Sequence, residues 1–215
     1  MKKFVMAAAL VAAGAFAGSA NAVVLTPANI SATNSVADGV ATPGVRTDVD
    51  NAFDGSAASF YSLGVGGSVT VDVSPLLLAS PATVLEVTFN SPNPRFPESA
   101  QIFVGGVLAG EIFNQQVSGV FFTAEAGFSI DVTPGSGGAS YAIGFANGAF
   151  STLTILDTTF VNFAGAYNNN PANSDGFDVA EISVSTVPVP AALPLLASAI
   201  AGVGFWSRRR KHAAK

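Results

Sequence analysis

Val69-Thr70-Val71-Asp72-Val73 alternates apolar and polar side chains with a period of two residues, which is the pattern of a β-strand with one buried face. Eight further segments are short, rich in β-branched or aromatic residues, and bounded by Gly, Pro, Asn or Ser. They are Thr83 to Phe89, Gln101 to Val104, Val107 to Phe113, Val117 to Thr123, Phe128 to Val132, Tyr141 to Phe145, Thr152 to Leu156 and Phe177 to Val184. Composition and boundaries of this kind predict strands.

The spacing of these segments predicts the fold class. Strands that follow one another at intervals of roughly 8–12 residues are typical of all-β sandwiches. We therefore expect a jelly-roll β-sandwich of about eight or nine antiparallel strands. Gly105-Gly106, between two predicted strands, indicates a tight hairpin. No stretch between Val23 and Thr186 has the length or period of a helix, and the longest irregular stretches are Thr26 to Ser68 and Asn162 to Asp175.

The first 22 residues have the layout of a secretory signal peptide. Lys2 and Lys3 give a positive start, and an apolar run follows from Phe4 to Phe16. Ala20-Asn21-Ala22 then supplies the small-x-small pattern that signal peptidase cleaves. Because the apolar run is shorter than the roughly 20 residues of a membrane span, we predict export, with a mature chain that begins near Val23.

A second apolar segment lies near the C-terminal end. Val187-Pro188-Val189-Pro190-Ala191 leads into an almost wholly apolar run that ends at Trp206, and Arg208-Arg209-Arg210-Lys211 follows. As a helix, residues 191–206 would extend about 24 Å, short of a hydrocarbon core of roughly 30 Å, although Trp206 and snorkelling arginines can make up the difference. The positive-inside rule keeps the cationic cluster in the cytoplasm, so the tail predicts a membrane anchor with the preceding chain outside.

The order of short Pro motif, apolar span and Arg cluster resembles the PEP-CTERM sorting signal. The resemblance implies recognition by an exosortase, a membrane transpeptidase of Gram-negative bacteria. The common motif is Val-Pro-Glu-Pro, and Val189 replaces the Glu here, so residues 187–191 are similar to the Val-Pro-x-Pro-Ala variant. A plain C-terminal anchor is the alternative. We thus expect a signal peptide (1–22), a β-sandwich domain (23–186) and a sorting tail (187–215) that holds the protein in the inner membrane before it reaches the cell surface or the extracellular space.

Charge is distributed unevenly along the chain. All 14 Asp and Glu lie within residues 23–186 with only Arg46 and Arg95, a net charge of 2 − 14 = −12 for that segment. Such a segment cannot neutralise phosphates, which excludes nucleic acid as a partner. The excess of acids indicates calcium outside the cell, or alternatively a surface kept soluble by self-repulsion. Because the chain has no cysteine, its stability must come from a core or a metal rather than from disulfides.

Three short motifs resemble discoidin-type, galactose-binding-like sandwiches. Asp50-Asn51-Ala52-Phe53-Asp54-Gly55 and Gly66-Gly67-Ser68-Val69-Thr70-Val71-Asp72 resemble the opening loop and strand of that family, and Asp175-Gly176-Phe177-Asp178-Val179-Ala180-Glu181-Ile182 resembles its closing strand. In many members the opening loop and the closing strand meet around a structural calcium ion. The resemblance therefore implies Asp54, nearby carbonyls of the loop from Asn51 to Ser59, and Glu181 as ligands, and oxygen ligands of this kind suit calcium. The alternative is that Asp54-Gly55 is only a tight turn.

Catalytic residues are not indicated. His212, the one histidine, lies in the tail, and there is no cysteine. Residues 23–186 therefore contain neither a Ser-His-Asp triad nor a His-metal site. Pairs of Asp and Glu at a suitable spacing can hydrolyse glycosides, which leaves a secreted hydrolase as the second alternative. We predict no catalytic residues and no enzymatic activity.

Carbohydrate binding is the first alternative, because the discoidin-like family includes carbohydrate-binding modules. Residues 23–186 have no Trp, and Tyr167 lies in an Asn-rich stretch. The candidate glycan-binding residues are therefore Tyr167, Asn168, Asn169 and Asn170. The main prediction is a non-catalytic structural or adhesive protein of the envelope, extracellular matrix or biofilm. Its expected partners are signal peptidase, an exosortase-type transpeptidase, the membrane and extracellular polysaccharide, with calcium as a structural cofactor.

Overall fold

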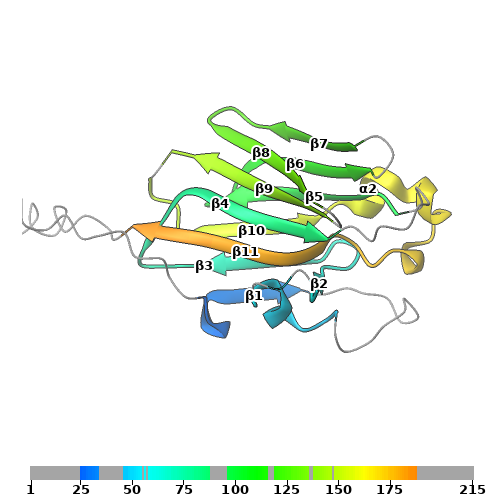
Figure 1. Cartoon of the computed structure of the whole chain (residues 1–215), viewed down its shortest axis with the longest axis horizontal. Coiled ribbons are helices and arrows are strands. Elements are labelled where there is room, and N and C mark those ends of the chain that lie inside the picture. Colours follow the sequence, from blue (N-terminus) through cyan, green and yellow to red (C-terminus); the bar gives the residue numbers. More distant parts are fainter. Residues whose placement is uncertain are drawn as a thin grey trace, which may run out of the picture. The chain divides into compact units, whose positions relative to one another are not determined.

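Two antiparallel β-sheets face each other in the computed structural model (Figure 1). The structure describes residues 25–33, 46–54, 56, 58–87, 96–115, 119–135, 138–146 and 148–187. Within these ranges one sheet has six strands in the order β1-β3-β10-β5-β6-β7, and the other has five in the order β2-β11-β4-β9-β8. The strands are β1 (Ile30–Thr33), β2 (Tyr61–Ser62), β3 (Ser68–Asp72), β4 (Leu77–Val87), β5 (Glu98–Val104), β6 (Val107–Gln115), β7 (Gly119–Ala124), β8 (Phe128–Gly135), β9 (Gly138–Phe145), β10 (Thr152–Asp157) and β11 (Asp178–Val187). This arrangement confirms the prediction of an all-β sandwich.

One hydrophobic core lies between the two sheets. In β3, Val69 and Val71 are fully buried, as expected where alternate side chains of a strand point to one face. Val84 of β4 and Ile143 of β9, from the other sheet, belong to the same core. Burying one side chain of this size contributes about 1.5–3 kcal/mol, so the two faces together hold the layers in place.

The hairpin between β5 and β6 forms where the sequence predicts it. Val104 pairs with Val107, and Gly105 and Gly106 form the turn. Their φ angles are 59° and 77°, the left-handed values that a two-residue turn of matching twist requires. A Cβ atom at Gly105 would also lie 2.5 Å from the Phe150 ring. The predicted hairpin is confirmed.

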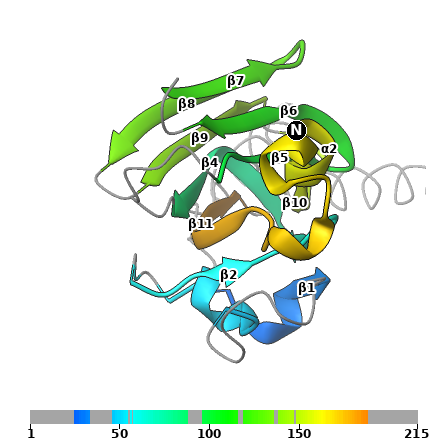
Figure 2. The ribbon, with the colours of Figure 1, turned by 90° about the vertical axis from the view of Figure 1, so that its right-hand side faces the viewer.

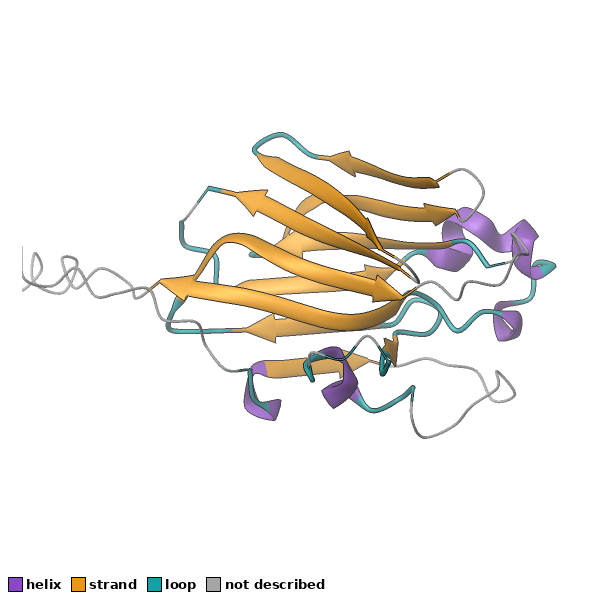
Figure 3. Ribbon diagram, viewed as in Figure 1, coloured by secondary structure: helices purple, strands orange, loops and turns teal. Residues whose placement is uncertain are grey.

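The irregular stretches contain more structure than predicted. Residues 26–68 hold β1, β2 and the 3-10 segments η2 (Pro27–Asn29) and η3 (Val49–Ala52). After β10 come the five-residue helix α2 (Thr159–Phe163) and the 3-10 segments η4 (Ala164–Tyr167) and η5 (Pro171–Asn173), outside the two sheets (Figure 3). β4 also begins at Leu77, earlier than expected. The described residues therefore form more strands than the eight or nine predicted, and their one α-helix is short. Elements of two to five residues are too short to show a period in the sequence.

The two ends of the chain lie mostly outside the described residues. The predicted signal peptide (1–22) is not described, and of the sorting tail only Val187 is described, as the last residue of β11. Within the described ranges, no helix is long and apolar enough to cross a membrane. The described residues fall in one compact unit, Asn21–Val187.

Candidate functional site

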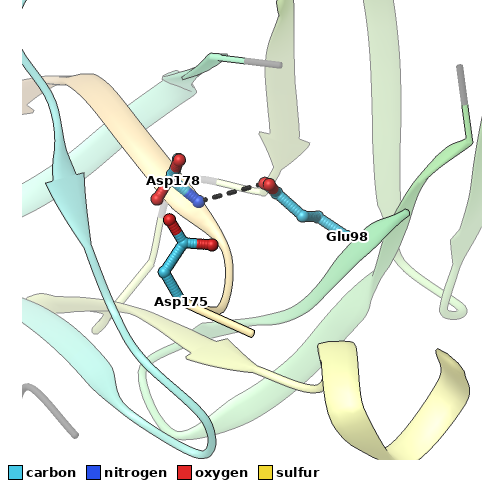
Figure 4. A group of neighbouring side chains, drawn as sticks. All are labelled: Glu98, Asp175 and Asp178. Atoms are coloured by element: carbon cyan, nitrogen blue, oxygen red, sulfur yellow. Dashed lines mark hydrogen bonds between the residues drawn. The ribbon is translucent and has the colours of Figure 1, made fainter. Parts of the chain in front are cut away.

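Three carboxylates gather at the end of the sandwich where β5 and β11 begin. Glu98 is the first residue of β5, Asp178 is the first residue of β11, and Asp175 lies in the loop before β11. One oxygen from each side chain lies within 4.8 Å of the other two, and Figure 4 shows the three side-chain ends close together. We call these residues the acidic cluster. Because β5 and β11 belong to different sheets, the cluster bridges the two layers.

Gly176 allows the chain to place Asp175 beside the start of β11. Its φ of 80° is left-handed, and a Cβ atom there would lie 2.5 Å from the carbonyl oxygen of Gly64. A side chain at this position would therefore be strained and would clash. The close approach lets the Gly64 N–H donate to the Asp175 carbonyl at 2.8 Å and the Leu63 N–H donate to the Phe177 carbonyl at 3.0 Å. Backbone hydrogen bonds thus fix the loop that carries Asp175.

The two inner carboxylates of the acidic cluster are buried. Asp178 is 0% exposed and Glu98 is 3% exposed. The Asp178 N–H donates to Glu98 Oε2 at 3.3 Å, and the Ser62 hydroxyl donates to Asp178 Oδ1 at 2.5 Å. The second oxygen of Asp178, Oδ2, is buried and accepts no hydrogen bond from the described residues. An unsatisfied buried carboxylate oxygen destabilises the folded state. A partner for this atom would therefore stabilise the cluster.

The electrostatics of the cluster disfavour three bare negative charges. Burial raises the pKa of Glu98 well above its usual value, and the neighbouring charges of Asp178 and Glu86 raise it further. Burial also raises the pKa of Asp178, with Asp175 as the next cause. Both shifts have the same origin, because low dielectric and like charges favour the neutral acid. Without a positive partner, the inner carboxylates keep protons at higher pH than exposed acids do.

Arg46 supplies one positive charge beside the acidic cluster. Its Nη1 lies 2.5 Å from Asp175 Oδ2, and its guanidinium lies over the Phe60 ring, 4.9 Å from the centroid. The pair is partly exposed, so its net contribution to stability is small. It offsets the charge of Asp175, the outermost carboxylate, and leaves Glu98 and Asp178 without an ion-pair partner among the described residues.

Asp54 and Glu181, the calcium ligands implied by the discoidin resemblance, lie elsewhere. Asp54 accepts hydrogen bonds from the Ser59 hydroxyl at 2.5 Å and from the Ser56 N–H at 2.8 Å, and these bonds, that from Ser59 first, lower its pKa. Glu181 is half-buried on β11, opposite Leu85 of β4. Neither belongs to a described group of three metal-ligating side chains. The bonds around Asp54 are those of a local turn.

Tyr167 is buried, whereas the asparagines that follow it, Asn168, Asn169 and Asn170, are exposed. The Tyr167 hydroxyl donates to the Pro97 carbonyl at 2.8 Å, and its ring centroid lies 6.2 Å from that of Phe96. Stacking a sugar on Tyr167 requires an exposed ring face, and the buried ring does not offer one. Phe96, which sequence reasoning did not single out, is 49% exposed.

Phe96 and the acidic cluster lie at the same end of the sandwich. Phe96 and Pro97 lead directly into Glu98, and Figure 2 shows α2 beside β5 at this end. Asp175 and Asp178 follow the segment η5 in the chain. An exposed aromatic ring and a buried acidic cluster are therefore neighbours in the structure.

Comparison with known proteins gives no family for this chain. No family model matches it, and no curated protein matches it. Several solved structures resemble it weakly, among them three that are described next. An arabinofuranosyltransferase AftD from Mycobacteria is 17% identical over 74% of this chain and 11% of its own length, with a TM-score of 0.41. The CBM32 of AlyQ, in complex with 4,5-unsaturated mannuronic acid, is 13% identical over 72% of this chain and 92% of its own, with a TM-score of 0.37.

The third structure is the CBM62 of Clostridium thermocellum Xyl5A, 13% identical over 74% of this chain and 94% of its own, with a TM-score of 0.38. Scores and identities at this level establish neither the function of the chain nor its site.

The sequence gives a sign that Asp178 is unusual, but it gives none for Glu98. Asp178 stands between Phe177 and Val179 in a strand-forming apolar run, where a charged residue is rare unless it has a partner. Glu98 begins a strand with no such contrast. Its burial depends on β6 and β11, which are distant in sequence, so only the structure brings Glu98 and Asp178 together.

Proposed function

We propose that this chain is a non-catalytic, adhesive β-sandwich module that binds neutral polysaccharide outside the cell. The observation that carries the proposal is the half-exposed ring of Phe96, which lies against the buried Tyr167. A ring held in this way offers a flat apolar face to the C–H groups of a sugar. The exposed Asn168, Asn169 and Asn170 bring amide donors and acceptors after Tyr167.

The charge of the segment favours neutral over acidic polysaccharide. Residues 23–186 carry a net charge of 2 − 14 = −12, and an acidic surface repels polyanions at moderate ionic strength. Arg46, one of the two basic residues in that segment, is paired with Asp175. A ligand rich in hydroxyl groups and without charge therefore suits this surface best.

The ends of the chain are part of the proposal. The signal-peptide pattern of residues 1–22 supports export, and residues 187–215, which resemble a PEP-CTERM tail, support sorting by an exosortase-type transpeptidase in a Gram-negative envelope. The module would then act at the cell surface or in the extracellular matrix.

A hydrolase is less well supported than a binding module. Glycoside hydrolysis needs two carboxylates that reach the substrate. In the acidic cluster, Glu98 and Asp178 are buried, and the Glu98 carboxylate accepts a hydrogen bond from the backbone N–H of Asp178. A sugar cannot approach carboxylates in that position.

The test is affinity electrophoresis of the full-length chain, kept in solution with a mild non-ionic detergent, through gels that contain a neutral galactomannan, a neutral β-glucan or alginate. We expect retardation by a neutral polymer and loss of about tenfold in affinity for Phe96→Ala, equivalent to roughly 1.4 kcal/mol. Phe122→Ala is the matched control, because Phe122 lies on β7 and is 44% exposed. Equal retardation of both variants, or none of the wild type, would contradict the proposal.

A further inference from the structure

One buried polar atom of the acidic cluster, and a second on the neighbouring strand β9, have no hydrogen-bond partner among the described residues. One is Oδ2 of Asp178, and the other is the hydroxyl of Tyr141 on β9; both are buried without a hydrogen-bond partner. Asp178 and Tyr141 are each 0% exposed. Buried polar atoms are nearly always paired, and each exception needs an explanation, of which a bound ion or water is one. Asp178 belongs to the acidic cluster, so its unpaired oxygen indicates that a partner is missing there.

Tyr141 lies within electrostatic reach of the cluster. Burial is the main reason that its pKa is raised, and the negative charges of Glu86 and Glu98 add to the effect. Glu86 is itself buried and accepts a hydrogen bond from Asn114 at 2.6 Å. The side chains near Tyr141 and the acidic cluster thus offer oxygen ligands, and the Arg46 guanidinium pairs with Asp175.

From this geometry we propose that Glu98, Asp175 and Asp178 bind one calcium ion. The three ligand oxygens lie within 4.8 Å of one another, close enough to share an ion that takes oxygen ligands at 2.3–2.6 Å. Their formal charge of −3 exceeds the +1 of Arg46, and Glu86 adds further negative charge nearby, so a divalent cation offsets most of the excess. Asp178 Oδ2 gains the partner that it lacks.

Calcium fits the site better than magnesium does. Magnesium keeps several waters in near-octahedral geometry, whereas calcium accepts flexible carboxylate shells of six to eight oxygens. Glu98 and Asp178 are buried, so little solvent reaches their oxygens. The partly exposed Asp175 is the side through which the ion and any coordinating water enter.

This site differs from the one that the discoidin resemblance implies. That site uses Asp54 and Glu181, whereas the proposed ion lies between the first residue of β5 and the first residue of β11. It therefore links one strand of each sheet. In a chain without cysteine, an ion in this position provides the cross-link between layers that a disulfide often supplies in exported proteins.

The experiment is a calcium titration of the full-length chain in mild detergent after removal of metals with a chelator. Calorimetry should give one calcium ion per chain, and thermal unfolding should show a rise of about 5–10 °C at a hundredfold excess over the dissociation constant. An absence of both heat and thermal shift would overturn the proposal. Equal binding of Mg²⁺ would overturn the assignment to calcium.

Variants locate the ion. Asp178→Asn and Glu98→Gln should abolish the calcium-induced shift, while the metal-free melting temperature stays the same or rises because like-charge repulsion is relieved. Asp175→Asn, at the exposed side of the site, should weaken calcium binding at least about tenfold. This variant tests the site even if the two variants at buried positions do not fold. Asp131→Asn, on the surface of β8, is the matched control and should bind calcium as the wild type does.

Two outcomes would move the ion elsewhere. A shift that survives all three cluster variants would overturn the site, and so would a shift lost in Asp54→Asn but kept in Asp178→Asn. The site does not rest on the proposed polysaccharide binding, since Phe96→Ala should lose retardation in the gel and keep the full calcium shift. The two proposals can therefore fail separately.

Discussion

At the scale of the single residue, the buried carboxylate of Asp157 connects three segments of backbone. It accepts hydrogen bonds from the N–H groups of Gly66 at 2.8 Å, Phe177 at 2.9 Å and Thr159 at 3.2 Å. Asp157→Ala leaves these donors without an acceptor, so we expect a loss of about 3 kcal/mol or more in the free energy of unfolding. Urea denaturation of the variant and the wild type measures this difference in the free energy of unfolding. Asp131→Ala, an exposed acid on β8, should change stability by less than about 0.5 kcal/mol; a similar small change for Asp157→Ala would refute the assigned role.

At the scale of the element, the short helix α2 depends on side-chain bonds to the six-stranded sheet. Nδ2 of Asn162 donates to Ser99 Oγ and Glu111 Oε1, each at 2.9 Å, and to Thr158 Oγ1 at 3.3 Å. A five-residue helix is not stable by itself, so Asn162→Ala should speed amide hydrogen exchange in α2 by about tenfold, with under about 1 kcal/mol of global destabilisation. Val161→Ala, at a position 83% exposed, is the control on the same helix. Unchanged exchange in Asn162→Ala would show that other contacts hold α2.

Elements with a local sequence pattern could be predicted from the sequence, and those without one could not. β3 and the β5–β6 hairpin were predictable because their pattern is local: Val69 and Val71 alternate with polar residues, and Gly105-Gly106 permits a left-handed turn. β1 was not, because its residues are mostly exposed at the sheet edge and carry no alternation of buried and exposed positions. The acidic cluster was not predicted either, since Glu98 and Asp178 are 80 residues apart. Its members meet only through the pairing of the sheets, whereas Asp54 and its two serines, close in sequence, form a turn.

At the scale of the whole molecule, the excess of acids is a property that no single contact explains. Residues 23–186 have a net charge of 2 − 14 = −12, and the one ion pair among the described residues is Arg46–Asp175. Charge of one sign destabilises a compact state by self-repulsion, and salt screens exposed charges at a Debye length of about 10 Å in 0.1 M salt. The stability of the sandwich should therefore depend on ionic strength even without calcium.

Thermal unfolding of the full-length chain in detergent and chelator, measured between low and moderate NaCl concentration, tests this. We expect the melting temperature to rise by a few degrees, because each kcal/mol shifts it by roughly 2–4 °C in a domain of this size. A variant with Asp50→Asn, Glu125→Gln and Asp131→Asn, all exposed positions, should melt higher at low salt and respond less to NaCl. The acidic cluster is intact in that variant, so its calcium shift should persist. A melting temperature that falls with NaCl would mean that attractive pairs, rather than repulsion among the acids, dominate the electrostatics of the fold.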